Sequence, residues 1–89
     1  MADITVRPLG EGRFRVTLTE GATKTEHEVT VGAEELERLG GGYGSADEFV
    51  RACFAFLLER EPKEQILRTF DVSVIGRYFP EFEDRIRRA

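Results

Sequence analysis

The chain has 89 residues, of which 40% are hydrophobic and 34% are charged, and its formal net charge is -4. This composition is typical of folded globular domains and excludes a disordered chain. Because charges of both signs are interspersed and the net charge is negative, a general phosphate-backbone binder is disfavoured. The length allows one domain, which we expect to span residues 1–89.

The cysteine content and the N-terminal segment predict the cellular compartment of the protein. Cys53 is the only cysteine, whereas small secreted domains usually depend on several disulfides. The N-terminal residues have neither the basic nor the apolar region of a signal peptide, and no apolar run approaches the roughly 18 residues of a membrane span. We therefore expect a cytoplasmic protein that does not enter a membrane.

Residues 3–31 alternate between apolar and polar side chains, which predicts a three-stranded antiparallel β-meander with one buried face. Gly21 and Ala22 suit a two-residue type II′ turn because Gly tolerates a positive φ at the first central position. This turn sets the pairing of the second and third strands. The predicted pairs are Arg15 with Glu28, Thr17 with Glu26 and Thr19 with Lys24 on the solvent face, and Phe14 with Val29 and Val16 with His27 on the core face.

Helices are predicted for the rest of the chain. A short helix is expected over residues 33–39, and the main helix over residues 45–60, where Ser45 and Glu48 form a capping box. Short helices are expected over residues 62–88, beginning with one that runs from Pro62 to about Thr69. The predicted fold is therefore α+β, with the meander followed by one long helix and two to three short helices packed on one face of the sheet.

The apolar side of the main helix is unusually wide. At roughly 100° per residue, its apolar side chains span about 200° of the helix surface. They are Phe49, Val50, Cys53, Phe54, Phe56, Leu57 and Leu58. One sheet face cannot cover this arc, so the helix is expected to contact a second layer, which is either the chain's own C-terminal helices or another subunit.

No residue pattern reaches the specificity of a catalytic, cofactor or metal signature. His27 is the only histidine, and its neighbours Glu26 and Glu28 project from the opposite face of the strand. Cys53 lies in the middle of the apolar arc, where a thiol behaves as a small hydrophobic group. We therefore expect a structural histidine, an inert cysteine, no catalytic residue, no cofactor, no metal and no enzymatic activity.

The segment RYFPEF, residues 77–82, concentrates aromatic side chains beside an arginine. This combination is enriched in the cores of protein interfaces, although a small domain also needs large side chains to close its own core. With the far edge of the main helix, it gives the candidate interface Phe54, Leu58, Arg77, Tyr78, Phe79 and Phe82. The partner is expected to be a second copy of the chain or another protein.

The stretch from Asp47 to Phe82, with the segments EFVRACFAFLLEREPKEQIL and FDVSVIGRYFPEF, resembles a family of short, uncharacterised bacterial proteins that have an N-terminal strand region. The resemblance covers the C-terminal half of the chain better than the N-terminal half. It implies a bacterial cytosolic setting and transfers no activity and no site residue. The order of strands then helix is also similar to small antitoxin-like domains at the level of the fold alone.

Three functions follow from these observations. The first is a non-enzymatic protein-interaction or regulatory domain. The alternative is a transcriptional or antitoxin-like regulator that binds nucleic acid through Arg68, Arg77, Arg85, Arg87 and Arg88, although we do not expect nucleic acid as a partner of an acidic chain. A weaker alternative is a small anion held by the loop from Gly40 to Ser45, which leads into a helix N-terminus but lacks the lysine of a phosphate-binding loop.

Overall fold

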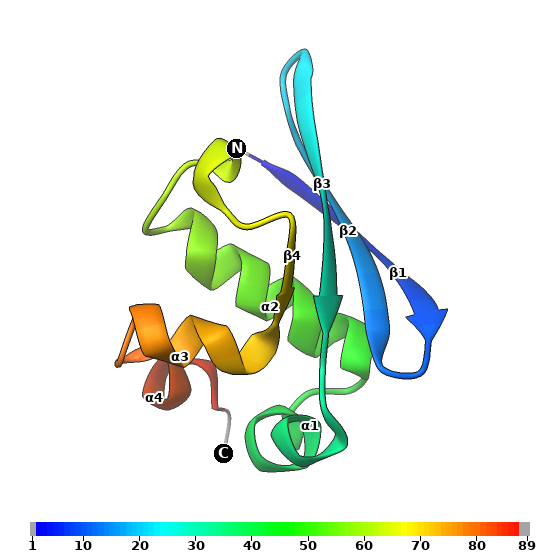
Figure 1. Cartoon of the computed structure of the whole chain (residues 1–89), viewed down its shortest axis with the longest axis vertical. Coiled ribbons are helices and arrows are strands. Elements are labelled where there is room, and N and C mark those ends of the chain that lie inside the picture. Colours follow the sequence, from blue (N-terminus) through cyan, green and yellow to red (C-terminus); the bar gives the residue numbers. More distant parts are fainter. Residues whose placement is uncertain (1, 88–89) are drawn as a thin grey trace.

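The computed structural model describes residues 2–87 and has an α+β fold with a four-stranded mixed sheet and several helices (Figure 1). The strand order in the sheet is β1-β2-β3-β4. The elements are β1 (Asp3–Gly10), β2 (Arg13–Glu20), β3 (Thr23–Thr30), α1 (Ala33–Gly40), α2 (Ala46–Leu58), the 3-10 turn η1 (Lys63–Gln65), β4 (Thr69–Asp71), the 3-10 turn η2 (Val72–Val74), α3 (Ile75–Tyr78) and α4 (Phe82–Ile86). The prediction of short helices up to residue 88 extends to Arg88, which lies outside the described residues.

The first three strands form the predicted antiparallel meander with the predicted register. Glu20 pairs with Thr23 across the two-residue turn, and Gly21 has a φ of +56°. All five predicted cross-strand pairs between β2 and β3 are present. Local alternation and one glycine turn therefore determine this half of the molecule.

A fourth strand replaces the helix predicted from Pro62 to Thr69. Only residues 63–65 form a 3-10 turn, and Thr69–Asp71 then form β4, which pairs in parallel with β3. The pairing satisfies hydrogen-bonding groups at the outer edge of β3, and the amide of Glu28 donates to the carbonyl of Arg68 at 2.7 Å. Edge pairing therefore outweighs the helix-compatible local sequence. The connection between β3 and β4 contains α1 and α2, as a parallel crossover requires.

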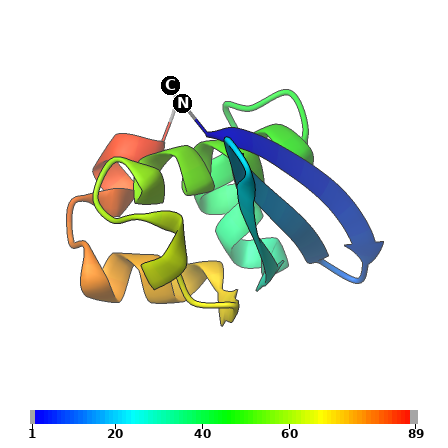
Figure 2. The same cartoon turned by 90° about the horizontal axis from the view of Figure 1, so that it is seen from above.

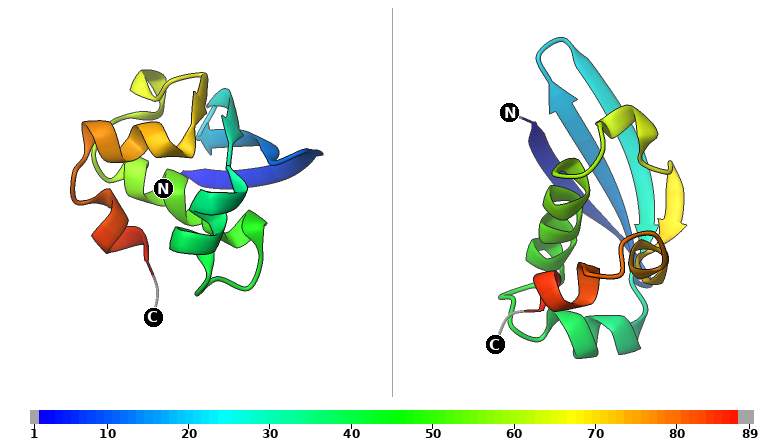
Figure 3. Two further views of the ribbon diagram at one scale, coloured as in Figure 1. Left: turned by 60° about the horizontal axis from the view of Figure 1, so that its bottom comes forward. Right: turned by 90° about the vertical axis from the view of Figure 1, so that its left-hand side faces the viewer.

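The helices lie on one side of the sheet (Figure 2). In the side view, α2 runs along the sheet, while α1, α3 and α4 gather near one end of it (Figure 3). The core between these layers contains Val16, Leu18, Phe49 and Phe54, whose side chains are fully buried. No helix within residues 2–87 is long and apolar enough to span a membrane.

α2 begins where the capping residues predict. The hydroxyl of Ser45 accepts a hydrogen bond from the amide of Glu48 at 3.2 Å. The carboxylate of Glu48 accepts from the amide of Gly44 at 3.1 Å, one residue earlier than a standard capping box places it. Two amides at this helix end are therefore satisfied by the chain itself.

The chain's own segments cover the wide apolar arc of α2. Phe54 faces the sheet side and lies with its ring centre 5.7 Å from that of Phe70 in β4. On another side, the ring of Phe56 packs against Phe79 and Phe82, with centre separations of 5.9 Å and 5.1 Å. Of the two predicted second layers, the chain's C-terminal half therefore supplies the contacts, and the width of the arc does not require a subunit.

Candidate functional site

An apolar groove opens between the end of α2, the segment from η1 to β4, and α3. Its volume is about 150 Å³. Most of its wall consists of aliphatic and aromatic side chains. The lining residues are Leu57, Glu61, Gln65, Ile66, Leu67, Phe70, Val74, Ile75, Tyr78 and Phe79. A cavity of this size and character accepts one aromatic ring or branched aliphatic side chain and is too small for a drug-sized ligand.

Two exposed hydrophobic side chains lie on the wall of this groove. Leu67 is 48% exposed and Tyr78 is 68% exposed, and they are the exposed large hydrophobic residues of this part of the chain. Both line the groove, although they come from segments on either side of it. Single exposed hydrophobic residues are ordinary on protein surfaces, whereas here two of them share one concave apolar wall.

The groove carries one charged side chain, Glu61, which follows the C-terminal end of α2. Within residues 2–87 its carboxylate makes no hydrogen bond or ion pair. The groove therefore combines an apolar floor with an uncompensated negative charge at its edge.

His27 in β3 holds the wall that contains Leu67. The Nδ1 atom of His27 lies 2.7 Å from the carbonyl oxygen of Leu67, and its Nε2 atom lies 2.8 Å from the hydroxyl oxygen of Thr25. The ring is 2% exposed and lies 5.6 Å from the ring of Phe54. Burial lowers the pKa of His27, partly offset by its bond to Leu67, and the positive charge of Arg68 lowers it further. His27 therefore links β3 to the groove wall through its hydrogen bond with Leu67.

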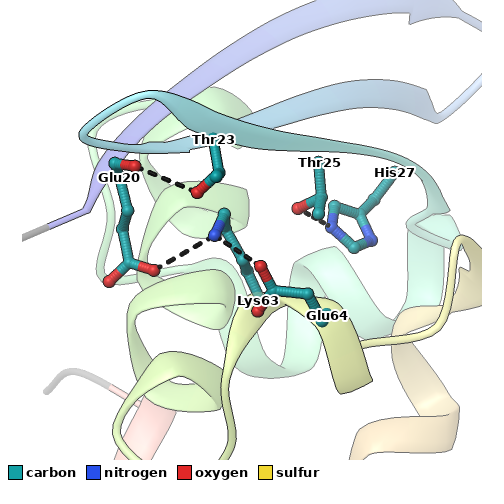
Figure 4. Close-up of polar contacts among 6 residues, drawn as sticks. All are labelled: Glu20, Thr23, Thr25, His27, Lys63 and Glu64. Atoms are coloured by element: carbon teal, nitrogen blue, oxygen red, sulfur yellow. Dashed lines mark hydrogen bonds and ion pairs between the residues drawn. The ribbon is translucent and has the colours of Figure 1, made fainter.

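A buried lysine anchors the turn before this segment. Lys63 in η1 is 2% exposed, and its ammonium group lies 2.6 Å from the carboxylate of Glu64 and 3.4 Å from that of Glu20 at the β2–β3 turn (Figure 4). The hydrogen bond with Glu64 raises the pKa of Lys63 against the opposing effect of desolvation, and the bond with Glu20 adds to the rise. Lys63 and His27 together fix both ends of the segment that forms the groove wall.

The other groups that could take part in catalysis or binding are buried or already hydrogen-bonded within the chain. Cys53 is fully buried, and burial raises the pKa of its thiol. No three His, Cys, Asp or Glu residues within residues 2–87 come close enough to hold a metal ion. The loop from Gly40 to Ser45 was the weaker prediction of an anion site, but the Glu48 carboxylate already binds the Gly44 amide. That carboxylate would repel an anion at the same place.

The predicted interface residues divide into two groups. Phe54 and Phe82 are 0% and 1% exposed, so the prediction that they form a surface is wrong for the folded chain. The large rings are used to cover α2 from within. Leu58 and Phe79 are partly buried, and Arg77 and Tyr78 are exposed. Only Tyr78 and Phe79 of the predicted set line the groove.

Three arginines of the nucleic-acid alternative lie near carboxylates. The pKa of Glu81 is lowered mainly by a backbone hydrogen bond and by Arg60, and that of Glu83 mainly by Arg38, with smaller effects from Arg85 and Arg87 respectively. Lys63 is the main cause of the lowered pKa of Glu64, and Arg68 adds a smaller effect. Arg88 lies outside the described residues. The nearby carboxylates weaken the positive potential that a phosphate backbone would need.

A second concavity of about 470 Å³ lies along the outer side of α2. Its floor includes Ala52 and Ala55, and its wall contains Tyr43, whose hydroxyl donates to the carbonyl of Ile86 at 2.6 Å. Four charged side chains also line it: Glu48, Arg51, Glu59 and Arg85. The lining of this cleft is more polar than that of the groove.

Sequence reasoning missed the residues that give the groove its depth. Ile66, Leu67, Phe70 and Ile75 come from the segment that was assigned to a helix and to core packing. The available signal was the pair Thr69 and Phe70, two strand-forming residues just before the Asp71 cap, whose side chain accepts from the Ser73 amide at 2.9 Å. Comparisons with protein-family models, with curated proteins and with solved structures found no match. The resemblance to short bacterial proteins therefore stays a prediction.

Proposed function

We propose that this chain is a non-enzymatic protein-interaction domain that holds an apolar side chain of a partner protein in the groove. The observation that carries the proposal is the placement of both exposed large hydrophobic residues, Leu67 and Tyr78, on the wall of one apolar concavity. Fully burying one Leu or Phe side chain contributes about 1.5–3 kcal/mol, which is enough for a specific anchor in a transient complex.

The partner is a protein segment that places a Lys or Arg beside its apolar anchor. Glu61 is the one charged residue of the groove and has no counter-charge among the described residues. A positive residue on the partner would supply that charge and would favour the correct orientation.

A second copy of the chain fits this groove less well than a basic segment does. In a twofold dimer the same patch lies on both sides of the interface, so Glu61 would face a surface that carries the same negative charge. Arg77 is exposed but does not line the groove. A different, basic partner is therefore favoured over self-association.

The test is selection from a random peptide library displayed on phage, followed by calorimetry with the best peptide. We expect the selected peptides to share one large apolar residue next to Lys or Arg. Leu67→Ser and Tyr78→Ser should each weaken binding by about tenfold. Glu61→Gln should weaken peptide binding by about two- to fivefold. The matched control is Glu37→Gln, at an exposed position of α1, which should not change the binding.

Two outcomes would contradict the proposal. Peptides that bind the Leu67→Ser and Tyr78→Ser variants as tightly as the natural chain would place the interaction elsewhere. A concentration-dependent dimer in light scattering that is abolished by Tyr78→Ser would make a second copy the occupant in place of a basic segment.

A further inference from the structure

Two successive carbonyl groups of the groove wall are held by β3 through different kinds of bond. The carbonyl oxygen of Leu67 lies 2.7 Å from Nδ1 of His27. The carbonyl oxygen of Arg68 accepts a hydrogen bond from the backbone amide of Glu28, also at 2.7 Å. The side chain of Leu67 lines the groove. Release of these two bonds would therefore move the groove wall away from the sheet.

The neutral form of His27 satisfies both of its contacts. A carbonyl oxygen only accepts hydrogen bonds, so Nδ1 carries a proton and donates a hydrogen bond to the carbonyl oxygen of Leu67. Nε2 then accepts from the hydroxyl of Thr25, at 2.8 Å. A second proton on Nε2 would reverse the Thr25 bond and would place a full positive charge on a ring that is 2% exposed.

Within residues 2–87, no carboxylate hydrogen-bonds or ion-pairs with the His27 ring. On β2 it faces Val16, and on α2 it faces the ring of Phe54. The groove segment contributes the guanidinium of Arg68, which disfavours a second positive charge. On the hairpin side of Thr25 lies the ion-paired cluster of Lys63, Glu20 and Glu64. Glu26 and Glu28 project from the opposite face of β3.

We propose that protonation of His27 releases residues 66–68 from β3 and dismantles the groove, so that mild acid switches off partner binding. The effect on a partner rests on the function proposed above, whereas the release of the segment does not. A ring freed from the sheet is solvated and gains its ordinary affinity for protons.

The direction follows from linkage. The pKa of the docked ring is lowered, chiefly by burial, and the pKa of the released ring is about 6.5. The attachment of residues 66–68 to β3, called docking here, is therefore at full strength above about pH 6.5. It weakens as the pH falls toward the pKa of the docked ring. Within that window the docking equilibrium changes by about tenfold per pH unit.

Hydrogen exchange followed by NMR between pH 7.5 and 5.5 reads the release without any partner. The reporter is the amide of Glu28, bonded to Arg68, and the control is the amide of Val31, which donates to the carbonyl of Gly12 at 2.7 Å on the other side of β3. After correction for the intrinsic exchange rate, protection of Glu28 relative to Val31 should fall by up to tenfold per pH unit below 6.5 and level off once the pH reaches the docked pKa. In His27→Gln, which does not titrate, the ratio should stay constant.

A second pair of variants keeps the test valid if His27→Gln folds poorly. Arg68→Gln removes the positive charge beside the ring, which raises the pKa of the docked ring toward that of the released ring and should therefore reduce the total fall in Glu28 protection on acidification. Arg77→Gln removes a charge that does not act on His27 and should leave that fall unchanged. A Glu28-to-Val31 ratio that stays constant while the His27 ring titrates would overturn the proposal.

The selected peptide then separates the two proposals. Release of the segment with loss of peptide binding at pH 5.5 supports both of them. Release of the segment when no peptide binds at any pH supports the switch and contradicts the proposed function. Equal peptide binding at pH 7.5 and 5.5, with the ring protonated at the lower pH, contradicts the switch.

Discussion

The ring of Phe56 in α2 packs edge-on against the ring of Phe82 in α4, with a centre separation of 5.1 Å. On the same ring, the guanidinium carbon of Arg60 lies 3.6 Å from the centre, and Arg60 also binds the carboxylate of Glu81 at 2.9 Å. The C-terminal aromatic segment therefore closes the core over α2, and only Tyr78 is left largely outside it.

Removal of the Phe82 ring should destabilise the whole domain. Phe82 is 1% exposed, so Phe82→Ala leaves a cavity and should lower the free energy of unfolding by about 3–5 kcal/mol. Tyr78→Ala is the matched control, because its ring is mostly in solvent and its loss should change stability by less than about 0.5 kcal/mol. Urea unfolding followed by circular dichroism measures both. Equal losses for the two variants would show that the segment packs differently.

The two hairpin glycines should respond differently to alanine. Gly21 has a φ of +56°, and a Cβ there would meet nothing within 4 Å, so Gly21→Ala should cost about 1 kcal/mol of backbone strain. Gly12 has a φ of +76°, and its Cβ would lie 2.7 Å from the carbonyl oxygen of Val31. Gly12→Ala should therefore cost more, about 2–3 kcal/mol, in the same unfolding experiment. A larger loss at Gly21 would contradict the assigned turn geometry.

The sequence predicts well the parts of the fold that local patterns determine. The β2–β3 register follows from alternation and from Gly21, and the start of α2 follows from Ser45. The buried positions of His27 and Cys53 also follow from their places in these patterns.

β4 and the groove were not predicted because they depend on contacts between distant residues. β4 has three residues, and it is a strand because it pairs with β3, where Phe70 lies opposite Val29. His27 and Leu67 are 40 positions apart, and nothing in the local sequence of either indicates their bond. The groove combines residues from α2, the η1–β4 segment and α3, so no single periodic pattern contains it.

The thiol of Cys53 should be unreactive in the folded protein. It is fully buried and its pKa is raised by that burial, so little thiolate forms and reagents cannot reach it. We expect Ellman's reagent at pH 8 to react only after guanidinium chloride unfolds the chain. A Ser73→Cys variant in a Cys53→Ala background supplies an exposed thiol as a control and should react at once. Rapid reaction of native Cys53 would contradict the packing of α2.

At pH values below those at which His27 titrates, the protonation of carboxylates should determine how the melting temperature falls with pH. The hydrogen bond from Arg38 lowers the pKa of Glu83, with bonds at 2.7 and 3.1 Å that join α1 to α4. Its contribution is therefore full above about pH 4.3, the unfolded value, and is lost as the pH falls through the lower folded pKa. Glu83→Gln should flatten the fall in Tm below pH 4.3, and Glu37→Gln, which forms no ion pair within residues 2–87, should not. Parallel curves for Glu83→Gln and the natural chain would exclude this contribution.

The binding surface can be located directly by NMR titration of the 15N- and methyl-labelled chain with the selected basic-apolar peptide at pH 7.5. We expect the largest shifts at Leu57, Ile66, Leu67, Ile75 and Tyr78, with nuclear Overhauser contacts from the apolar side chain of the peptide to Leu67. Shifts that instead cluster at Ala52, Ala55 and Ile86, around the second concavity, would contradict the groove as the site of interaction.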